Sequence, residues 1–125
     1  MDTQQTQINE EWRQVVGYEG IYEVSNTGKI NIINYRNLGY KKRKKPTIMF
    51  GYERITLIKG EHRQNMGVHR VVAMAFLPNP QNLPSINHKD ENKLNNNVNN
   101  LEWCSVAYNN AYGTGRKRAA KKKAS

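Results

Sequence analysis

The chain has 125 residues, and its 20 Lys and Arg against 10 Asp and Glu give a formal net charge of +10 at neutral pH. That length fits one small domain, or one domain with an appended module, and the charge favours a polyanionic partner, either nucleic acid or an anionic membrane surface. No apolar run approaches the roughly 18 residues of a membrane span, and the first residues lack the features of a signal peptide. We therefore expect a cytoplasmic protein with no membrane partner.

The number of cysteines limits which disulfide and metal sites the chain can form. Cys104 is the only cysteine, which excludes an internal disulfide and any cysteine-rich zinc knuckle within one chain. We expect no structural zinc. Because free cysteine is among the most buried residue types, we expect an inert, buried thiol at this position rather than a nucleophile.

The N-terminal half has the pattern of short strands. Residues 1–9 are polar and are expected to be a flexible N-terminus. Residues 12–16, 21–25 and 29–33 alternate β-branched or aromatic residues with polar ones, and Gly and Asn separate these runs. This pattern predicts a small antiparallel meander. The aromatic residues expected to form its core are Trp12, Tyr18 and Tyr22.

The middle of the chain contains five consecutive cations. Residues 35–47 predict a loop or hairpin tip, residues 48–52 and 54–58 predict two further strands, and residues 60–67 predict a turn region. The cations are either solvated loop residues or phosphate contacts, and the overall charge favours phosphate contacts. These residues are Lys41, Lys42, Arg43, Lys44 and Lys45.

The C-terminal half begins with a helical pattern. Apolar residues recur at helical spacing over 68–77, and a proline follows. Short strands are then expected at 85–87 and 101–104, around a long polar loop. A serine can cap a brief helix over about 106–112. Residues 114–125 predict a basic, disordered tail, which serves either DNA affinity or nuclear localisation. The tail cations assigned to DNA are Arg116, Lys117 and Arg118.

A strand, loop, strand and short helix over 84–112 outline a possible metal-dependent site. His88 has the pKa that suits a general base, and the amide oxygens of Asn87 and Asn109 suit a hard divalent cation. Asn100 could hydrogen-bond across the loop and hold His88 in place. The alternative interpretation is a polar turn region, because asparagine fills seven of the fourteen positions 87–100 and is a common turn residue.

Two long ordered segments resemble a known family. Val-His-Arg-Val-Val-Ala-Met-Ala-Phe-Leu-Pro-Asn-Pro at 68–80, Ile-Asn-His at 86–88 and Asn-Leu-Glu-Trp at 100–103 resemble the HNH endonucleases of phages and intron-borne homing enzymes. Residues 11–30 are similar to the small DNA-binding module that often precedes this nuclease core. The resemblance implies an α+β fold, in which a small antiparallel β-sheet module (10–60) precedes a ββα-metal core (61–113).

The resemblance also implies roles for individual residues. His88 carries over as the general base, Asn100 as the orienting residue, and Asn87 with Asn109 as metal ligands. The cofactor implied is Mg²⁺ or Mn²⁺, with no small-molecule cofactor, and the partner is double-stranded DNA. One motif copy implies a monomer or weak dimer that nicks one strand and leaves 5′-phosphate and 3′-hydroxyl ends. Arg70, beside the histidine of the first segment, is a further candidate for DNA contact, whereas His69 is expected to pack in the core.

Three departures from the family pattern keep a second function open. Many wider relatives have Asp where this chain has Asn87, Tyr108 stands where Glu is common, and no helix-turn-helix module follows Asn109. A neutral amide holds a divalent cation less tightly than a carboxylate does. The alternatives are a DNA-binding protein with a degenerate nuclease core, or an accessory subunit of a phage DNA-processing machine.

Overall fold

The computed structural model describes residues 9–112. Over these residues the strands form one four-stranded, one three-stranded and one two-stranded sheet, all with antiparallel neighbours. The first sheet has the order β1 (Trp12–Gln14), β2 (Tyr22–Ser25), β3 (Ile30–Ile32) and β4 (Lys42–Lys44), with the 3₁₀ turn η1 (Tyr35–Asn37) before β4. The second sheet contains β5 (Thr47–Met49), β6 (Tyr52–Lys59) and β7 (His62–Gly67).

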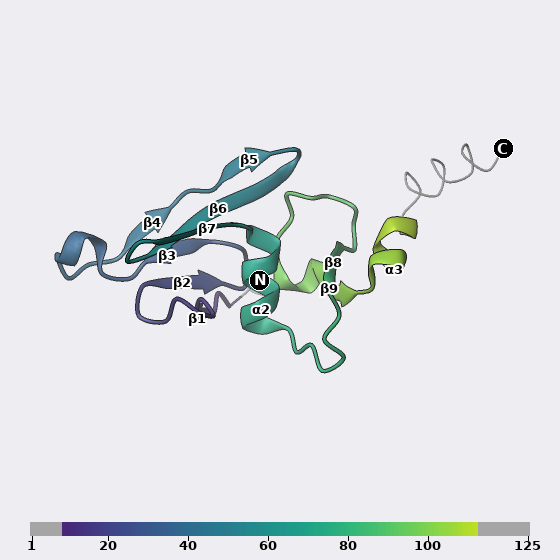
Figure 1. The fold of residues 1–125 in the computed structure, drawn as a ribbon, viewed down its shortest axis with the longest axis horizontal. Coiled ribbons are helices and arrows are strands. Elements are labelled where there is room, and N and C mark those ends of the chain that lie inside the picture. The colour runs from purple at the N-terminus through teal and green to yellow at the C-terminus, as the bar shows by residue number, and fades with distance from the viewer. Residues whose placement is uncertain (1–8, 113–125) are drawn as a thin grey trace, which may run out of the picture.

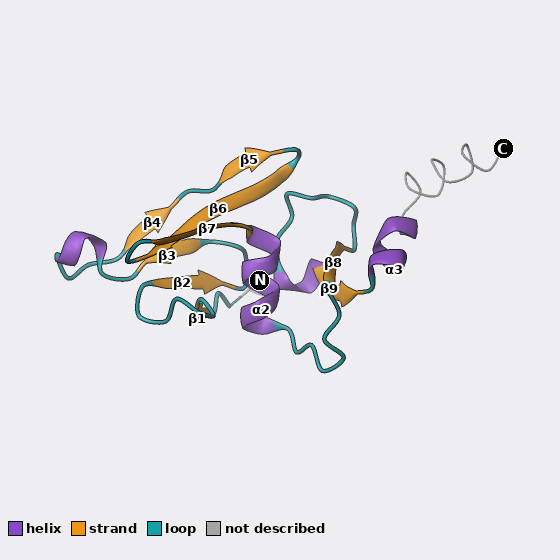
Figure 2. Cartoon of the chain, in the orientation of Figure 1, coloured by secondary structure: helices purple, strands orange, loops and turns teal. Residues whose placement is uncertain are grey.

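The remaining elements follow β7 without returning to either sheet. Helix α2 (Val68–Phe76) lies between the two sheets and the C-terminal elements, as Figure 1 shows. The strand β8 (Ser85–His88), the 3₁₀ turn η2 (Val98–Asn100), the strand β9 (Leu101–Cys104) and the helix α3 (Val106–Ala111) complete the described chain, and Figure 2 shows the same path by element type. The α+β class predicted from the sequence is confirmed.

The predicted meander is present as β1 to β3, but the predicted loop over the consecutive cations is wrong. Lys42, Arg43 and Lys44 form β4 and pair with β3. A strand of cations is stable here because β4 is an edge strand, where long charged side chains reach solvent. Arg43 also donates from Nε to Asn31 Oδ1 at 2.8 Å, and Lys41 Nζ lies 3.2 Å from a Glu23 carboxylate oxygen.

Two further boundaries differ from the prediction. Residues 48–52 are not one strand, because Met49 pairs with Tyr52 across a tight turn at Phe50 and Gly51. Residues 60–67 are not a turn region, because residues 62–67 form β7 and pair with β6 in regular register. The exposed polar residues of β7 have no apolar alternation, so their pairing with β6 alone makes them a strand.

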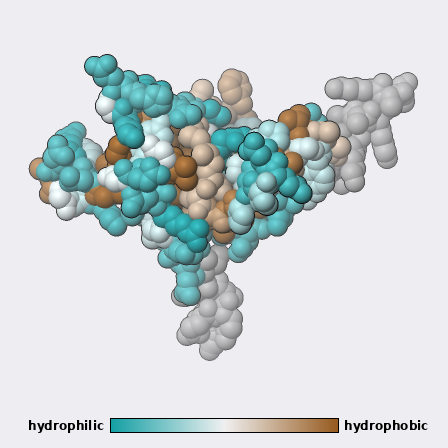
Figure 3. Space-filling view, turned by 60° about the horizontal axis from the view of Figure 1, so that its bottom comes forward, coloured by the Kyte–Doolittle hydropathy of each residue, from teal (hydrophilic) through white to brown (hydrophobic). Residues whose placement is uncertain are grey.

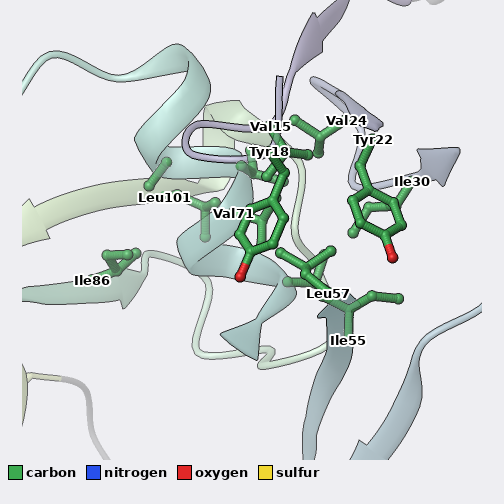
Figure 4. Packing of buried hydrophobic residues seen from close by; sticks show 13 residues of the cluster. Val15, Tyr18, Tyr22, Val24, Ile30, Ile55, Leu57, Val71, Ile86 and Leu101 are labelled. Atoms are coloured by element: carbon green, nitrogen blue, oxygen red, sulfur yellow. The ribbon is translucent and has the colours of Figure 1, made fainter. Parts of the chain in front are cut away.

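One hydrophobic core joins the sheets to the C-terminal elements (Figure 4). Val71 and Val72 on α2 are at most 1% exposed, and they belong to the same cluster as Leu57 on β6 and Leu101 on β9. The prediction that aromatic residues form the core is confirmed for Tyr18 and Tyr22, which are buried. Trp12 is only half-buried, beneath the Arg43 guanidinium. The buried positions that fill the cluster are Val15, Tyr18, Tyr22, Val24, Ile30, Ile55, Leu57, Val68, Val71, Val72, Ala73, Ile86 and Leu101.

Two local predictions at the C-terminal elements are also confirmed. The Ser105 side chain accepts a hydrogen bond from the Tyr108 backbone N–H at 3.0 Å, which caps α3. Cys104 is a free, buried cysteine. In the part of the chain described here, no helix is long and apolar enough to span a bilayer.

Candidate functional site

The candidate site is built on the β8–β9 pair, with α3 packed against β8. In this pair, His88 lies opposite Leu101 and Asn87 lies opposite Glu102. Successive side chains of a strand point to opposite faces. His88 therefore faces α2 and the β5–β6 hairpin, and Asn87 faces the side on which Glu102 meets α3.

The His88 ring is held by a chain of two hydrogen bonds. Its Nε2 lies 2.9 Å from Asn96 Oδ1, and Asn96 Nδ2 donates to Glu53 Oε1 at 2.9 Å. A carboxylate only accepts hydrogen bonds, so the nitrogen of the amide must face Glu53 and its oxygen must face the ring. Nε2 of His88 therefore carries the hydrogen, and Nδ1 keeps the lone pair that a general base needs.

Burial keeps this ring neutral. His88 is 6% exposed, and loss of solvent lowers its pKa, opposed by the Asn96 hydrogen bond and the Asp90 carboxylate. The rings of His69 and Tyr52 pack beside it, with centroids 5.1 and 6.1 Å away. At neutral pH the imidazole is thus available to accept a proton.

His69, predicted as a packed core histidine, lies in the first turn of α2 against His88 and Tyr52. Burial first, and then the charges of His88 and two arginines, lower its pKa to about 4. Gly67 makes this packing possible, because a Cβ there would lie only 2.4 Å from the ring carbon Cε1 of His69.

Asn100 holds the loop after His88 rather than its ring. The Asn100 carbonyl accepts from the Lys89 backbone N–H at 2.7 Å, and its side-chain oxygen accepts from the Asp90 backbone N–H at 2.9 Å. Its Nδ2 donates to the Asp90 carboxylate and to the Asn95 carbonyl, both at 2.9 Å. These contacts fix the point where the chain leaves β8.

Asn87 has a carboxylate partner that the sequence analysis overlooked. The buried Asn87 amide donates from Nδ2 to Glu102 Oε2 at 2.7 Å, and the Tyr108 hydroxyl lies 3.4 Å from the same oxygen. Since its nitrogen is engaged by Glu102, the amide oxygen of Asn87 is the atom turned away from that carboxylate.

The donor set suits a hard divalent cation. Asn109 on α3 reaches β8, where its Nδ2 lies 3.5 Å from the Ile86 carbonyl oxygen, and like Asn87 it offers an amide oxygen. Mg²⁺ favours one or two carboxylates and retained waters, and Glu102 supplies a negative charge beside Asn87. Over residues 9–112 no group of three or more His, Cys, Asp or Glu side chains could hold a metal ion.

The described cations that the sequence assigns to DNA lie on or next to β4 and on α2. On β4 successive side chains alternate between two faces; Arg43 lies over the Trp12 ring and Lys42 over the Tyr35 ring. Arg70 donates to the Pro84 carbonyl at 2.8 Å and its guanidinium lies over the Trp103 ring, and its contact with DNA stays a prediction. The remaining candidates, Arg116, Lys117 and Arg118, lie outside the described residues.

Asn96, Glu53 and Glu102 are the site residues that sequence reasoning missed. Asn96 is 3% exposed, yet it is one of several consecutive asparagines, so its burial has no signal in the sequence. Glu53 lies 43 positions away from the amide that it holds. The alternation of β9 offered one clue, because it places Glu102 opposite Asn87 once the hairpin register is known.

Two family models match the chain. One, described as HNH endonuclease, matches residues 66–111, and another, the NUMOD4 motif, matches residues 10–58. The chain is 39% identical over 99 residues to the DNA endonuclease I-HmuI of Bacillus phage SP01, which covers 79% of this chain and 55% of that protein. It is 40% identical over 114 residues to an uncharacterised HNH endonuclease of Acanthamoeba polyphaga mimivirus, which covers 90% of this chain and 33% of the relative.

A solved structure of the HNH homing endonuclease I-HmuI, described as showing DNA binding and cleavage, has the same arrangement. It superposes with a TM-score of 0.67 at 36% identity, over 91% of this chain and 68% of the other. The chain thus spans only about a third to about half of the length of these two curated relatives.

Proposed function

Because this chain belongs to the HNH endonuclease family, we propose that it is a metal-dependent endonuclease that hydrolyses phosphodiester bonds in double-stranded DNA. The observation that carries this proposal is the chain of hydrogen bonds from half-buried Glu53 through buried Asn96 to buried His88, which supports a neutral histidine with a lone pair on Nδ1.

In this proposal His88 is the general base. Its Nδ1 takes a proton from the attacking water, while Asn96 stabilises the ring through Nε2–H as positive charge develops. Asn100 keeps the loop after His88 in one conformation through its contacts with residues 89 and 90. The ring therefore meets the phosphate without further rearrangement.

The cation would be held on the other face of β8. Asn87 and Asn109 offer amide oxygens there, with the Glu102 carboxylate behind Asn87. A bound divalent cation, which we propose to be Mg²⁺ or Mn²⁺, supplies neutralisation of charge on the phosphate oxygens. Asn87 and His88 point to opposite faces, so the residues that would hold the cation and the proposed base lie on two sides of the end of β8.

The N-terminal segment would grip the duplex. We propose residues 10–60 as a DNA-binding module and residues 61–113 as the nuclease core, with phosphate contacts from Lys41 to Lys45 and from the basic tail at 116–118. One base per chain supports nicking of a single strand by a monomer or weak dimer. Because the proposed substrate is DNA, we also propose that the protein acts in the cytoplasm.

The test is cleavage of supercoiled plasmid with Mg²⁺ or Mn²⁺, with and without EDTA. We expect nicked circles that depend on the cation. His88→Ala should abolish nicking and leave DNA affinity nearly unchanged, because the ring contributes a proton acceptor and little charge. His62→Ala, which removes an exposed histidine stacked on Tyr18, is the matched control and should nick normally. Full nicking by His88→Ala would refute the assignment.

A second candidate function is DNA binding by a degenerate nuclease core. The neutral Asn87 side chain favours it, because its face of β8 offers a cation two amides and only the carboxylate of Glu102. This candidate predicts duplex binding with no nicking at any Mg²⁺ or Mn²⁺ concentration. An accessory role in a larger DNA-processing assembly predicts nicking only when a partner protein is added.

A further inference from the structure

The β5–β6 hairpin ends in an unusual turn. Met49 pairs with Tyr52, so Phe50 and Gly51 are its two central residues, with φ of 56° and 83°. A two-residue hairpin turn with φ positive at both positions is of the I′ kind, which favours Asn, Asp or Gly at the first position. Glycine is well suited to the second, but a bulky aromatic at the first is strained.

The Phe50 side chain is also in solvent. It is 90% exposed, the highest value among the large exposed apolar residues described, and the neighbouring Ile48 and Met49 are 62% and 47% exposed. Figure 3 shows a molecular face that is mostly hydrophilic. The protein therefore carries a side chain that neither its turn nor its core benefits from, and such local conflicts concentrate at functional sites.

The turn lies beside the candidate base. The Tyr52 ring, two residues after Phe50, is 6.1 Å from the His88 ring, and the next residue, Glu53, holds Asn96. Because Met49 pairs with Tyr52, Phe50 lies in the turn that directly precedes Tyr52. Figure 1 shows this tip next to the loop between β8 and β9.

A lysine lies beside the turn. A Cβ at Gly51 would lie 3.6 Å from Lys93 Cδ, and the Lys93 ammonium is 4.8 Å from the centre of the Tyr52 ring. Lys44 and Lys45 precede the hairpin in the chain. An apolar tip with the Lys93 ammonium beside it fits a ligand that has apolar faces bordered by phosphates, which is a base step of a duplex.

We propose that Phe50 is a wedge that inserts between stacked base pairs of duplex DNA, beside the phosphate that His88 addresses. This inference rests on the proposed function. Phe, Leu, Ile and Met serve as such wedges in DNA-bending proteins, which unstack one step and kink the duplex. Ile48 and Met49 would follow Phe50 along the groove, and Lys93 would contact the adjoining phosphate.

The experiment uses the full chain in EDTA, so that binding is observed without cleavage. Duplexes carry 2-aminopurine at successive positions around the nick mapped on plasmid. Since 2-aminopurine brightens when it loses its stacking neighbours, we expect a several-fold increase in fluorescence at one step near the nick. Phe50→Ala and Phe50→Asn should lose this increase and bind the duplex more weakly, whereas Phe50→Leu should retain part of it.

Stability separates the wedge from a structural role. Phe50→Asn places a favoured residue in the turn, so its melting temperature should rise by a few degrees while the fluorescence response disappears. Leu38→Ala, which removes an apolar side chain that is 62% exposed elsewhere, is the control and should leave the response intact.

Three outcomes would overturn the proposal. The wild type could bind and nick without brightening any position, which would leave the proposed endonuclease standing and remove the wedge. Phe50→Asn could brighten 2-aminopurine as the wild type does. Sedimentation could show that Phe50→Asn dissociates a dimer, which would make the tip a self-association surface. A wild type that neither binds nor nicks DNA would instead refute the proposed function itself.

Discussion

The pairing of Asn87 with Glu102 makes the effect of restoring a carboxylate at position 87 conditional. From the sequence alone, Asn87→Asp is expected to lower the Mg²⁺ concentration for half-maximal cleavage. In the structure the Asn87 amide donates to Glu102 Oε2 at 2.7 Å, so the substitution replaces a donor by a second carboxylate. We therefore expect Asn87→Asp alone to lower the stability of the protein. Together with Glu102→Gln, the same substitution should raise the affinity for the cation.

The repulsion between carboxylates at positions 87 and 102 can be estimated from their separation. Two unit charges about 4 Å apart repel by about 4 kcal/mol at an effective dielectric constant of about 20. Because Glu102 is only half-buried, and one carboxyl of the pair can keep its proton, we expect roughly 2 kcal/mol of lost unfolding free energy in the variant without metal. In the double variant, the amide introduced at position 102 donates to the carboxylate introduced at position 87, so the hydrogen bond reverses and the repulsion disappears.

The assay is a double-mutant cycle with two readouts. Urea unfolding in EDTA measures the repulsion, and Mn²⁺ titration by electron paramagnetic resonance measures cation affinity without cleavage. Affinity should rise in the order Glu102→Gln, wild type, double variant, because the double variant moves the one carboxylate to the cation side. Equal urea midpoints and equal Mn²⁺ affinities for Asn87→Asp and the double variant would show that Glu102 does not control this site.

Two further predictions concern the histidines. Asn96→Ala should lower kcat more than KM and move the acid limb of the pH–rate profile to lower pH, because the Asn96 hydrogen bond raises the pKa of His88; Glu53→Gln, which still accepts from Asn96, should retain most activity. The pKa of His69 falls from 6.5 to about 4 on folding, so the unfolded chain binds a proton first on acidification. Stability is complete above pH 6.5 and falls by about 3 kcal/mol towards pH 4, and urea unfolding of His69→Gln should show a flatter dependence.

Most of the fold could be predicted from local sequence patterns. The strand alternation of residues 21–25, the helical spacing of 68–77 and the capping serine before α3 depend on neighbours in sequence, and these predictions hold. Strands β4 and β7 could not be predicted, because their own residues carry no local strand pattern. Their polar, charged residues have no apolar face to reveal them, and only pairing with β3 and β6 keeps them extended.

The candidate site could be predicted only in its family-like part. His88, Asn87, Asn100 and Asn109 stand at motif positions, and their roles remain proposals. Asn96 could not be separated from its neighbours, because composition does not show which of several asparagines turns its side chain inwards. That choice depends on a partner 43 positions away on β6.

The candidate site is therefore not confined to the segment that carries the HNH motif. Glu53 lies within the segment matched by the NUMOD4 motif, yet it orients Asn96 and, through it, His88. The Val98 N–H also donates to the Asn26 carbonyl at 2.8 Å, which ties the same loop to the first sheet. Because a buried hydrogen-bond network is destabilised when one partner is missing, packing of the N-terminal sheets and orientation of the His88 ring are coupled. If DNA binds those sheets as proposed, it contacts an element that is already hydrogen-bonded to the loop after His88.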